Sequence, residues 1–188
     1  RYKVGLVSSI YANYGRYYQF LTSVNLGVSS PIDLWFPLDG NVDPGISNHY
    51  ILGFNSQLNN YLAFEVEGYY KDYNNLVEYR IETDYEWDNE TGSLKDIYNM
   101  GKGFSYGGDV LLRNNYNGIE GFLGYSFGIT KRKIENVNVN PETDQSEYYF
   151  PKFDRTHQIN LVQTVNISRV FSKLYLGSEM KLGTSFAY

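Results

Sequence analysis

The segment YLAFEVEGYYK, residues 61–71, decides the fold class of this chain. Its apolar residues Leu62, Phe64 and Val66 alternate with the charged residues Glu65 and Glu67. A period of two residues places successive side chains on opposite faces of a β-strand. The segment therefore predicts a strand with one apolar face and one charged face.

The same alternation recurs in 119–130, 158–167 and 174–186, and helical spacing fits none of these segments. We therefore predict an all-β chain with seven strands, at 3–11, 47–57, 61–80, 104–114, 118–132, 155–167 and 174–188. Short links at 58–60, 115–117 and 168–173 alternate with long connections at 12–46, 81–103 and 133–154. Short periplasmic turns and long extracellular loops are typical of the antiparallel up-and-down meander of a transmembrane β-barrel.

Composition narrows the class of function. The net charge of -5 gives no reason to expect nucleic acid as a partner, and the absence of cysteine excludes a disulfide framework and a thiolate metal site. Tyrosine is unusually frequent, with 20 residues against 11 Phe and 2 Trp. A phenol ring has one apolar and one polar end, which suits a membrane–water boundary. A soluble β-sandwich with a tyrosine-rich binding face is the alternative explanation.

An odd number of strands has a consequence for the barrel. With seven strands, the last one runs outward and ends at Tyr188 on the extracellular rim, whereas bacterial barrels have even strand numbers. We therefore expect residues 1–188 to be part of one outer-membrane β-barrel domain that is truncated at both ends.

Four segments carry a resemblance to a known family. In chain order they are YGRYYQ (14–19), EVEGYYKDYNNL (65–76), GKGFSYGGD (101–109) and FPKFDRTHQINL (150–161). Together they resemble barrel segments of TonB-dependent outer-membrane receptors. The resemblance implies a barrel of about twenty-two strands in the cell outer membrane, in contact with outer-membrane lipid and closed by a separate plug domain. It also implies import of a scarce nutrient (a siderophore, a cobalamin or an oligosaccharide), energised by TonB through that plug, which is absent from this chain.

Aromatic residues in the long connections are the candidate ligand-binding residues. Exposed rings on loops can stack on a ligand, although anchoring at the membrane boundary or packing within the loop is an alternative for each of them. The candidates are Trp35, Tyr85, Trp87, Tyr148 and Tyr149.

The sequence predicts no catalytic, metal or cofactor site. Glu65 and Glu67 share one strand face about 7 Å apart and are interpreted as polar, lumen-facing residues. His49 and His157, the only histidines, lack the spacing of a zinc site, and no Gly-x-Ser-x-Gly motif occurs. We therefore expect a transport protein that is not an enzyme. A passive porin or small barrel, and then a soluble β-rich binding protein, are the alternatives.

Overall fold

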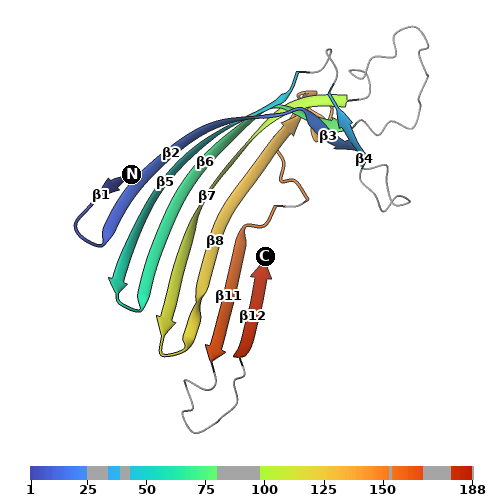
Figure 1. The fold of residues 1–188 in the computed structure, drawn as a ribbon. Coiled ribbons are helices and arrows are strands. Elements are labelled where there is room, and N and C mark those ends of the chain that lie inside the picture. Colours follow the sequence, from blue (N-terminus) through green and yellow to red (C-terminus); the bar gives the residue numbers. More distant parts are fainter. Residues whose placement is uncertain (25–33, 39–42, 80–97, 153, 167–178, 188) are drawn as a thin grey trace.

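The computed structural model describes residues 1–24, 34–38, 43–79, 98–152, 154–166 and 179–187. These residues are all-β and form one eight-stranded antiparallel sheet with two small hairpins (Figure 1). No helix in the described part of the chain has the length and hydrophobicity needed to cross a membrane.

The sheet is a meander, because its strands pair in chain order, β1-β2-β5-β6-β7-β8-β11-β12. The pairing runs from β1 at one edge to β12 at the other, and the sheet does not close into a barrel. The strands are β1 (Tyr2–Lys3), β2 (Ser8–Gln19), β5 (Gly45–Asn59), β6 (Leu62–Tyr79), β7 (Tyr98–Tyr116), β8 (Ile119–Ile134), β11 (His157–Asn166) and β12 (Glu179–Ala187). The hairpins are β3 (Leu21–Val24) with β4 (Leu34–Pro37) and β9 (Val139–Asn140) with β10 (Gln145–Ser146).

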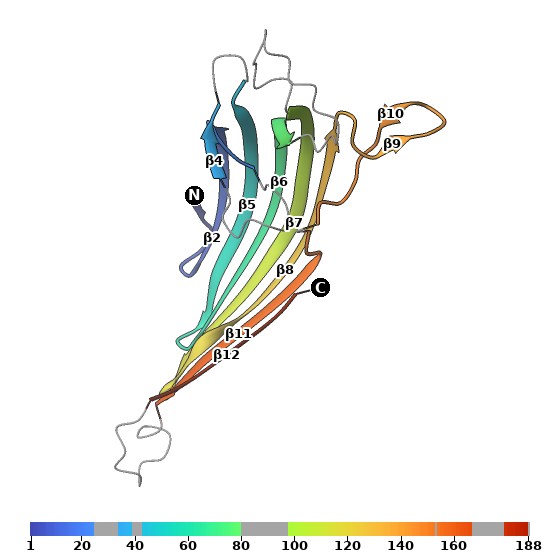
Figure 2. The ribbon, with the colours of Figure 1, turned by 90° about the vertical axis from the view of Figure 1, so that its right-hand side faces the viewer.

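The connections alternate between short and long, as predicted. The short turns 4–7, 60–61 and 117–118 lie at one end of the sheet, called the turn end. The connections 20–44, 80–97 and 135–156 leave the opposite end, called the loop end. The hairpin β9–β10 belongs to the last of these and projects beside the sheet in Figure 2. The predicted short link 168–173 lies outside the described residues.

The turn between β7 and β8 shows why the strands reverse where they do. Asn117 and Gly118 both have positive φ, at 48° and 82°. Two such residues form the tight turns whose twist matches that of antiparallel strands, and Asn-Gly is the preferred pair. The turn places Tyr116 opposite Ile119, and the same register continues without interruption to Gly101 and Ile134.

The predicted first strand, 3–11, is wrong. Gly5 has a φ of +86°, and residues 4–7 reverse the chain so that Tyr2 pairs with Ile10. The segment is therefore divided between β1 and the beginning of β2, and the sheet has eight strands where seven were predicted. β2 then continues to Gln19, through residues predicted to be loop.

Other boundaries also differ from the prediction. β7 begins at Tyr98 and not at residue 104, because the glycine-rich segment 101–108 is extended and paired on both sides. Residues 174–178 of the predicted last strand, and Tyr188, lie outside the described residues. Ala187 pairs with Gln158, which is itself opposite Ser126, near the middle of β8.

Candidate functional site

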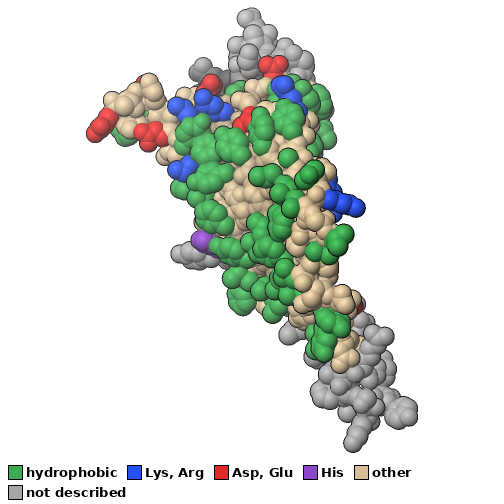
Figure 3. Space-filling model, turned by 90° about the vertical axis from the view of Figure 1, so that its left-hand side faces the viewer, with side chains coloured by type: hydrophobic (Ala, Val, Ile, Leu, Met, Phe, Trp, Pro, Cys, Tyr) green, Lys and Arg blue, Asp and Glu red, His purple; other side chains and the backbone are tan. Residues whose placement is uncertain are grey.

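The first candidate site is the convex face of the curved sheet, called the apolar face below (Figures 1 and 3). Cross-strand pairing arranges its side chains in rows that cross the strands. Four consecutive rows contain no Asp, Glu, Lys or Arg. They are Tyr14-Tyr50-Tyr70-Tyr106-Ile129, then Ala12-Leu52-Gly68-Gly108-Phe127-His157, then Ile10-Phe54-Val66-Val110-Tyr125-Ile159-Phe186, and last Ser8-Ser56-Phe64-Leu112-Leu123-Leu161-Thr184.

A row of four tyrosines forms the border of the apolar face toward the loop end. Tyr14, Tyr50, Tyr70 and Tyr106 occupy successive strands, with ring centroids 5.2 Å apart for the first pair and 6.4 Å for the second. All four rings are exposed. The next row toward the loop end contains charged residues, including Arg16, Asp72 and Lys131. The tyrosine row therefore separates an uncharged surface from a charged one.

The apolar face is open. Leu52 is 62% exposed and Phe186 68%, and Figure 3 shows hydrophobic side chains gathered over this side of the molecule. Ile134 is the one large apolar side chain that is fully buried among the described residues. The described residues therefore leave the large apolar side chains of this face partly or largely exposed.

His157 is the polar exception within the four rows. Its Nδ1 atom lies 2.9 Å from the hydroxyl oxygen of Tyr125, and its ring packs on Phe127 with centroids 5.4 Å apart. The hydrogen bond and the ring contact reduce the cost of an imidazole on an apolar surface.

The concave side, called the polar face, is lined by hydrogen-bonded side chains. The Tyr11 hydroxyl lies 2.9 Å from Glu65 Oε1 and 2.5 Å from Glu67 Oε1. Because a phenol carries one proton, the two carboxylates compete for a single donor. As predicted, Glu65 and Glu67 lie on the face opposite to Phe64 and Val66.

Tyrosines on the polar face lie across glycines of the neighbouring strands. A Cβ atom added to Gly53 would be 2.2 Å from Cζ of Tyr11, which is its cross-strand partner. The hydroxyl of Tyr69 would be 2.6 Å from such an atom on Gly107 and 2.7 Å on Gly128. Only residues without a side chain leave room for these rings. Tyr11 and Tyr69 thus lie on the polar face, whereas Tyr14, Tyr50, Tyr70 and Tyr106 border the apolar face.

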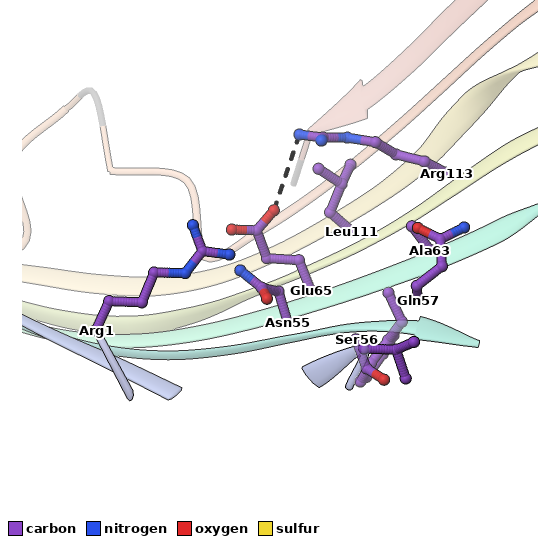
Figure 4. A pocket seen from close by; sticks show the side chains of 10 residues that line it. Arg1, Asn55, Ser56, Gln57, Ala63, Glu65, Leu111 and Arg113 are labelled. Atoms are coloured by element: carbon purple, nitrogen blue, oxygen red, sulfur yellow. Dashed lines mark ion pairs between the residues drawn. The ribbon is translucent and has the colours of Figure 1, made fainter. Parts of the chain in front are cut away.

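A hollow of about 280 Å³ lies on the polar face near the turn end (Figure 4). Arg1 Nε donates to Ser9 Oγ at 3.1 Å, and Ser9 Oγ donates to Asn55 Oδ1 at 2.7 Å. Across the hollow, Arg113 and Glu65 point toward each other at 3.8 Å, but the arginine side chain is 63% exposed. So exposed an ion pair contributes little stability.

No group of acidic, histidine or cysteine side chains in the described part of the chain could hold a metal ion.

The predicted ligand-binding aromatics do not form one site in the described part of the structure. Trp35 pairs with Ser23 in the β3–β4 hairpin, where only its backbone is described, and Tyr85 and Trp87 lie outside the described residues. Tyr148 packs on Phe104 of the apolar face, with centroids 5.3 Å apart. Tyr149 forms a β-bridge with Arg132, which belongs to the polar face. Tyr148 and Tyr149 therefore lie on opposite sides of the sheet.

Tyr149 is held at the loop end by a hydrogen bond to a distant strand. Its hydroxyl donates to Glu78 Oε2 at 2.8 Å, and its backbone exchanges two hydrogen bonds with Arg132. Burial, together with this bond to a carboxylate, raises the pKa of Tyr149 to about 12. Since the folded pKa lies above the usual value of 10, the contribution to stability is complete below pH 10 and is lost as the pH rises through about 12.

Replacement of Tyr149 by Phe should loosen the 135–156 connection. A hydrogen bond to a charged group at a partly exposed site contributes about 1 kcal/mol, so the backbone amides of Arg132 and Tyr149 should exchange hydrogen roughly fivefold faster. Tyr148→Phe is the matched control, because the Tyr148 hydroxyl has no hydrogen-bond partner within the described residues. Equal acceleration in both variants at pH 8 would contradict a role for the bond to Glu78.

Comparisons with protein-family models, with curated proteins and with solved structures found no match to this chain. The candidate surfaces are therefore interpreted from their own geometry. The tyrosine row was not among the predicted site residues, although the turn at 60–61 already places Tyr50 and Tyr70 near each other on paired strands.

Proposed function

We propose that this chain forms part of the wall of an outer-membrane β-barrel, with the apolar face toward lipid and the polar face toward the lumen. The observation that carries the proposal is the apolar face itself, with four rows free of charged residues and a border of four tyrosines. Transmembrane barrels have an outward apolar band flanked by aromatic residues and a polar interior.

The height of these four rows, measured along the strands, supports this proposal. Adjacent rows are two residues apart, so the first and the last of the four rows are separated by roughly 20 Å along the strands. The apolar band of such barrels is about 25 Å tall. Two further rows toward the turn end also lack Asp, Glu, Lys and Arg. The nearer one contains the polar residues Asn114 and Gln163, and the farther one contains Ile119 and Val165, so the four rows are the most apolar part of a longer uncharged surface.

The direction of curvature supports it as well. The apolar side chains occupy the convex side and the hydrogen-bonded polar side chains the concave side, which is the arrangement needed for a barrel with a wet interior. In the same proposal the loop end is extracellular and the turn end is periplasmic.

The proposed activity is uptake of a scarce nutrient, such as a siderophore, a cobalamin or an oligosaccharide, energised through TonB. The resemblance of the four sequence segments to TonB-dependent receptors supports this activity, and the long connections at the loop end are suited to contact a ligand from outside. The protein would act by binding and transport, without chemistry on the ligand.

The orientation of the two faces can be tested with single cysteines, since the chain contains none. Leu112→Cys and Leu111→Cys lie next to each other on opposite faces, and each is labelled with a fluorophore in the full-length protein folded into vesicles. We expect brominated lipid to quench the label at residue 112, and aqueous iodide to quench the label at residue 111. Equal quenching of both labels by iodide would instead favour a soluble β-rich binding protein.

The transport activity requires a separate test in cells. A strain that lacks the gene is grown with a panel of iron chelates, cobalamin or oligosaccharides as the only source of the nutrient, with and without a protonophore. We expect the strain that lacks the gene to lose uptake of one class of nutrient. In the wild-type strain, uptake of that class should stop when the proton gradient collapses. Uptake that continues without the gradient would indicate a passive porin.

A further inference from the structure

A group of lysines borders the apolar face beyond the tyrosine row. Lys102 and Lys133 are direct cross-strand partners, and Lys131 lies two residues from Lys133 on the same face of β8. In Figure 3, Lys and Arg side chains lie beside the hydrophobic surface at the loop end. We call Lys102, Lys131 and Lys133 the lysine cluster.

The pairing of Lys102 with Lys133 is unfavourable by itself. Side chains that face each other across antiparallel strands have Cβ atoms about 4.5–5.5 Å apart, and like charges in this position repel. Within the described residues, none of the three ammonium groups forms an ion pair. Lys131 instead lies over the ring of Phe150, 4.9 Å from its centroid. An anion bound between the lysines would remove the repulsion.

The structure has space for such an anion. A hollow of about 540 Å³ is lined by Lys102 and Lys133, together with Asn74, Gln145 and Ser146 as further hydrogen-bonding side chains. Glu135 is the acidic residue that lines it. Another carboxylate on this face, that of Asp72, already accepts hydrogen bonds from Asn48 and Asn74 through Oδ2. The hollow therefore combines two cations and neutral donors with one carboxylate.

The position of the hollow identifies the occupant. Lys102 and Lys133 project from the same face as Tyr106, about two rows beyond it toward the loop end. Given the proposed function, on which this inference rests, that level is the headgroup layer of the membrane that covers the apolar face. We propose that the lysine cluster binds a phosphate group of an anionic lipid headgroup, with Lys102 and Lys133 as the main contacts and Lys131 beside them.

The test measures lipid binding by the full-length protein in detergent, with native mass spectrometry. The probes are phosphatidylglycerol, phosphorylated lipid A, phosphatidylcholine and inorganic phosphate. We expect the two anionic lipids to bind at least about tenfold more tightly than phosphatidylcholine, and the double variant Lys102→Gln/Lys133→Gln to lose this preference. Lys71→Gln is the control for the loss of a lysine elsewhere, because it removes one positive charge from the polar face, where Lys71 lies over Tyr69.

Two results would overturn the inference. One is an unchanged lipid preference in the double variant, and the other is binding of inorganic phosphate as tight as that of the anionic lipids, which would identify a free-anion site. Labels at residues 111 and 112 are measured in the double variant at the same time. If their quenching pattern is normal while the lipid preference is unaffected by the substitutions, the headgroup site is rejected and the barrel wall is retained.

Discussion

Replacement of Val110 by Arg should lower the folded yield of the full-length protein in lipid vesicles more than any other single change discussed here. Val110 lies in the third of the four uncharged rows, between Val66 and Tyr125. An arginine near the middle of the bilayer on the lipid-facing side of a barrel costs about 2–4 kcal/mol. Native stabilities are about 5–15 kcal/mol, so this loss is a large fraction of the total.

The neighbouring substitution Leu111→Arg is the control. Leu111 lies on the polar face directly opposite Glu65, so the new guanidinium would lie beside a carboxylate. Folded and unfolded protein are separated by their different mobilities on unheated gels, across a series of urea concentrations. If both variants shift the urea midpoint equally, the assignment of the two faces is wrong.

Replacement of Gly107 by Ala should destabilise the sheet by about 1–3 kcal/mol, a typical cost for overpacking a site that cannot expand. A Cβ atom at residue 107 would lie 2.1 Å from the backbone oxygen of Phe127 and 2.6 Å from the hydroxyl of Tyr69. The backbone contact cannot be relieved by a rotation of a side chain. The two strands must therefore separate locally, and the ring of Tyr69 must leave its position.

Gly124→Ala is the control for this change. Gly124 lies on the same polar face, and its nearest contact would be an ordinary one, 3.7 Å from Leu111. Urea midpoints of both variants in vesicles provide the comparison. A shift for Gly124→Ala as large as that for Gly107→Ala would mean that glycine acts through backbone flexibility and not through the close approach of Tyr69 and β8.

Much of the sheet is predictable because strand residues alternate where one face is apolar. Leu62, Phe64 and Val66 identify the apolar side of β6 directly, and Asn117-Gly118 identifies a tight turn. β2 shows the limit of this signal. Beyond Ala12 it contains Asn13, Tyr14, Gly15 and Arg16, with polar or aromatic residues on both faces, so alternation stops although the strand continues.

The lysine cluster could be predicted from the sequence, whereas the side-chain contacts on the polar face could not. A two-residue turn at 117–118 sets Tyr116 opposite Ile119, and counting outward from this pair brings Lys102 opposite Lys133. The approach of Tyr11 to Glu67 spans three strands, β2, β5 and β6, and depends on the absence of a side chain at Gly53. To predict this contact, one would need the register of both strand pairs and the rotamer of Tyr11. The alternation of apolar and polar residues specifies neither.

The tyrosines that lie across glycines have a consequence for movement along the concave surface. In the proposed barrel, the rings of Tyr11 and Tyr69 lie along the wall and do not project into the channel, so the inner surface is smooth at these positions. The Tyr11 hydroxyl is already engaged by carboxylates of the same wall. A solute or a protein segment that moves past Tyr11 meets a hydroxyl that is already hydrogen-bonded. Weak binding at each point along a path favours passage over retention.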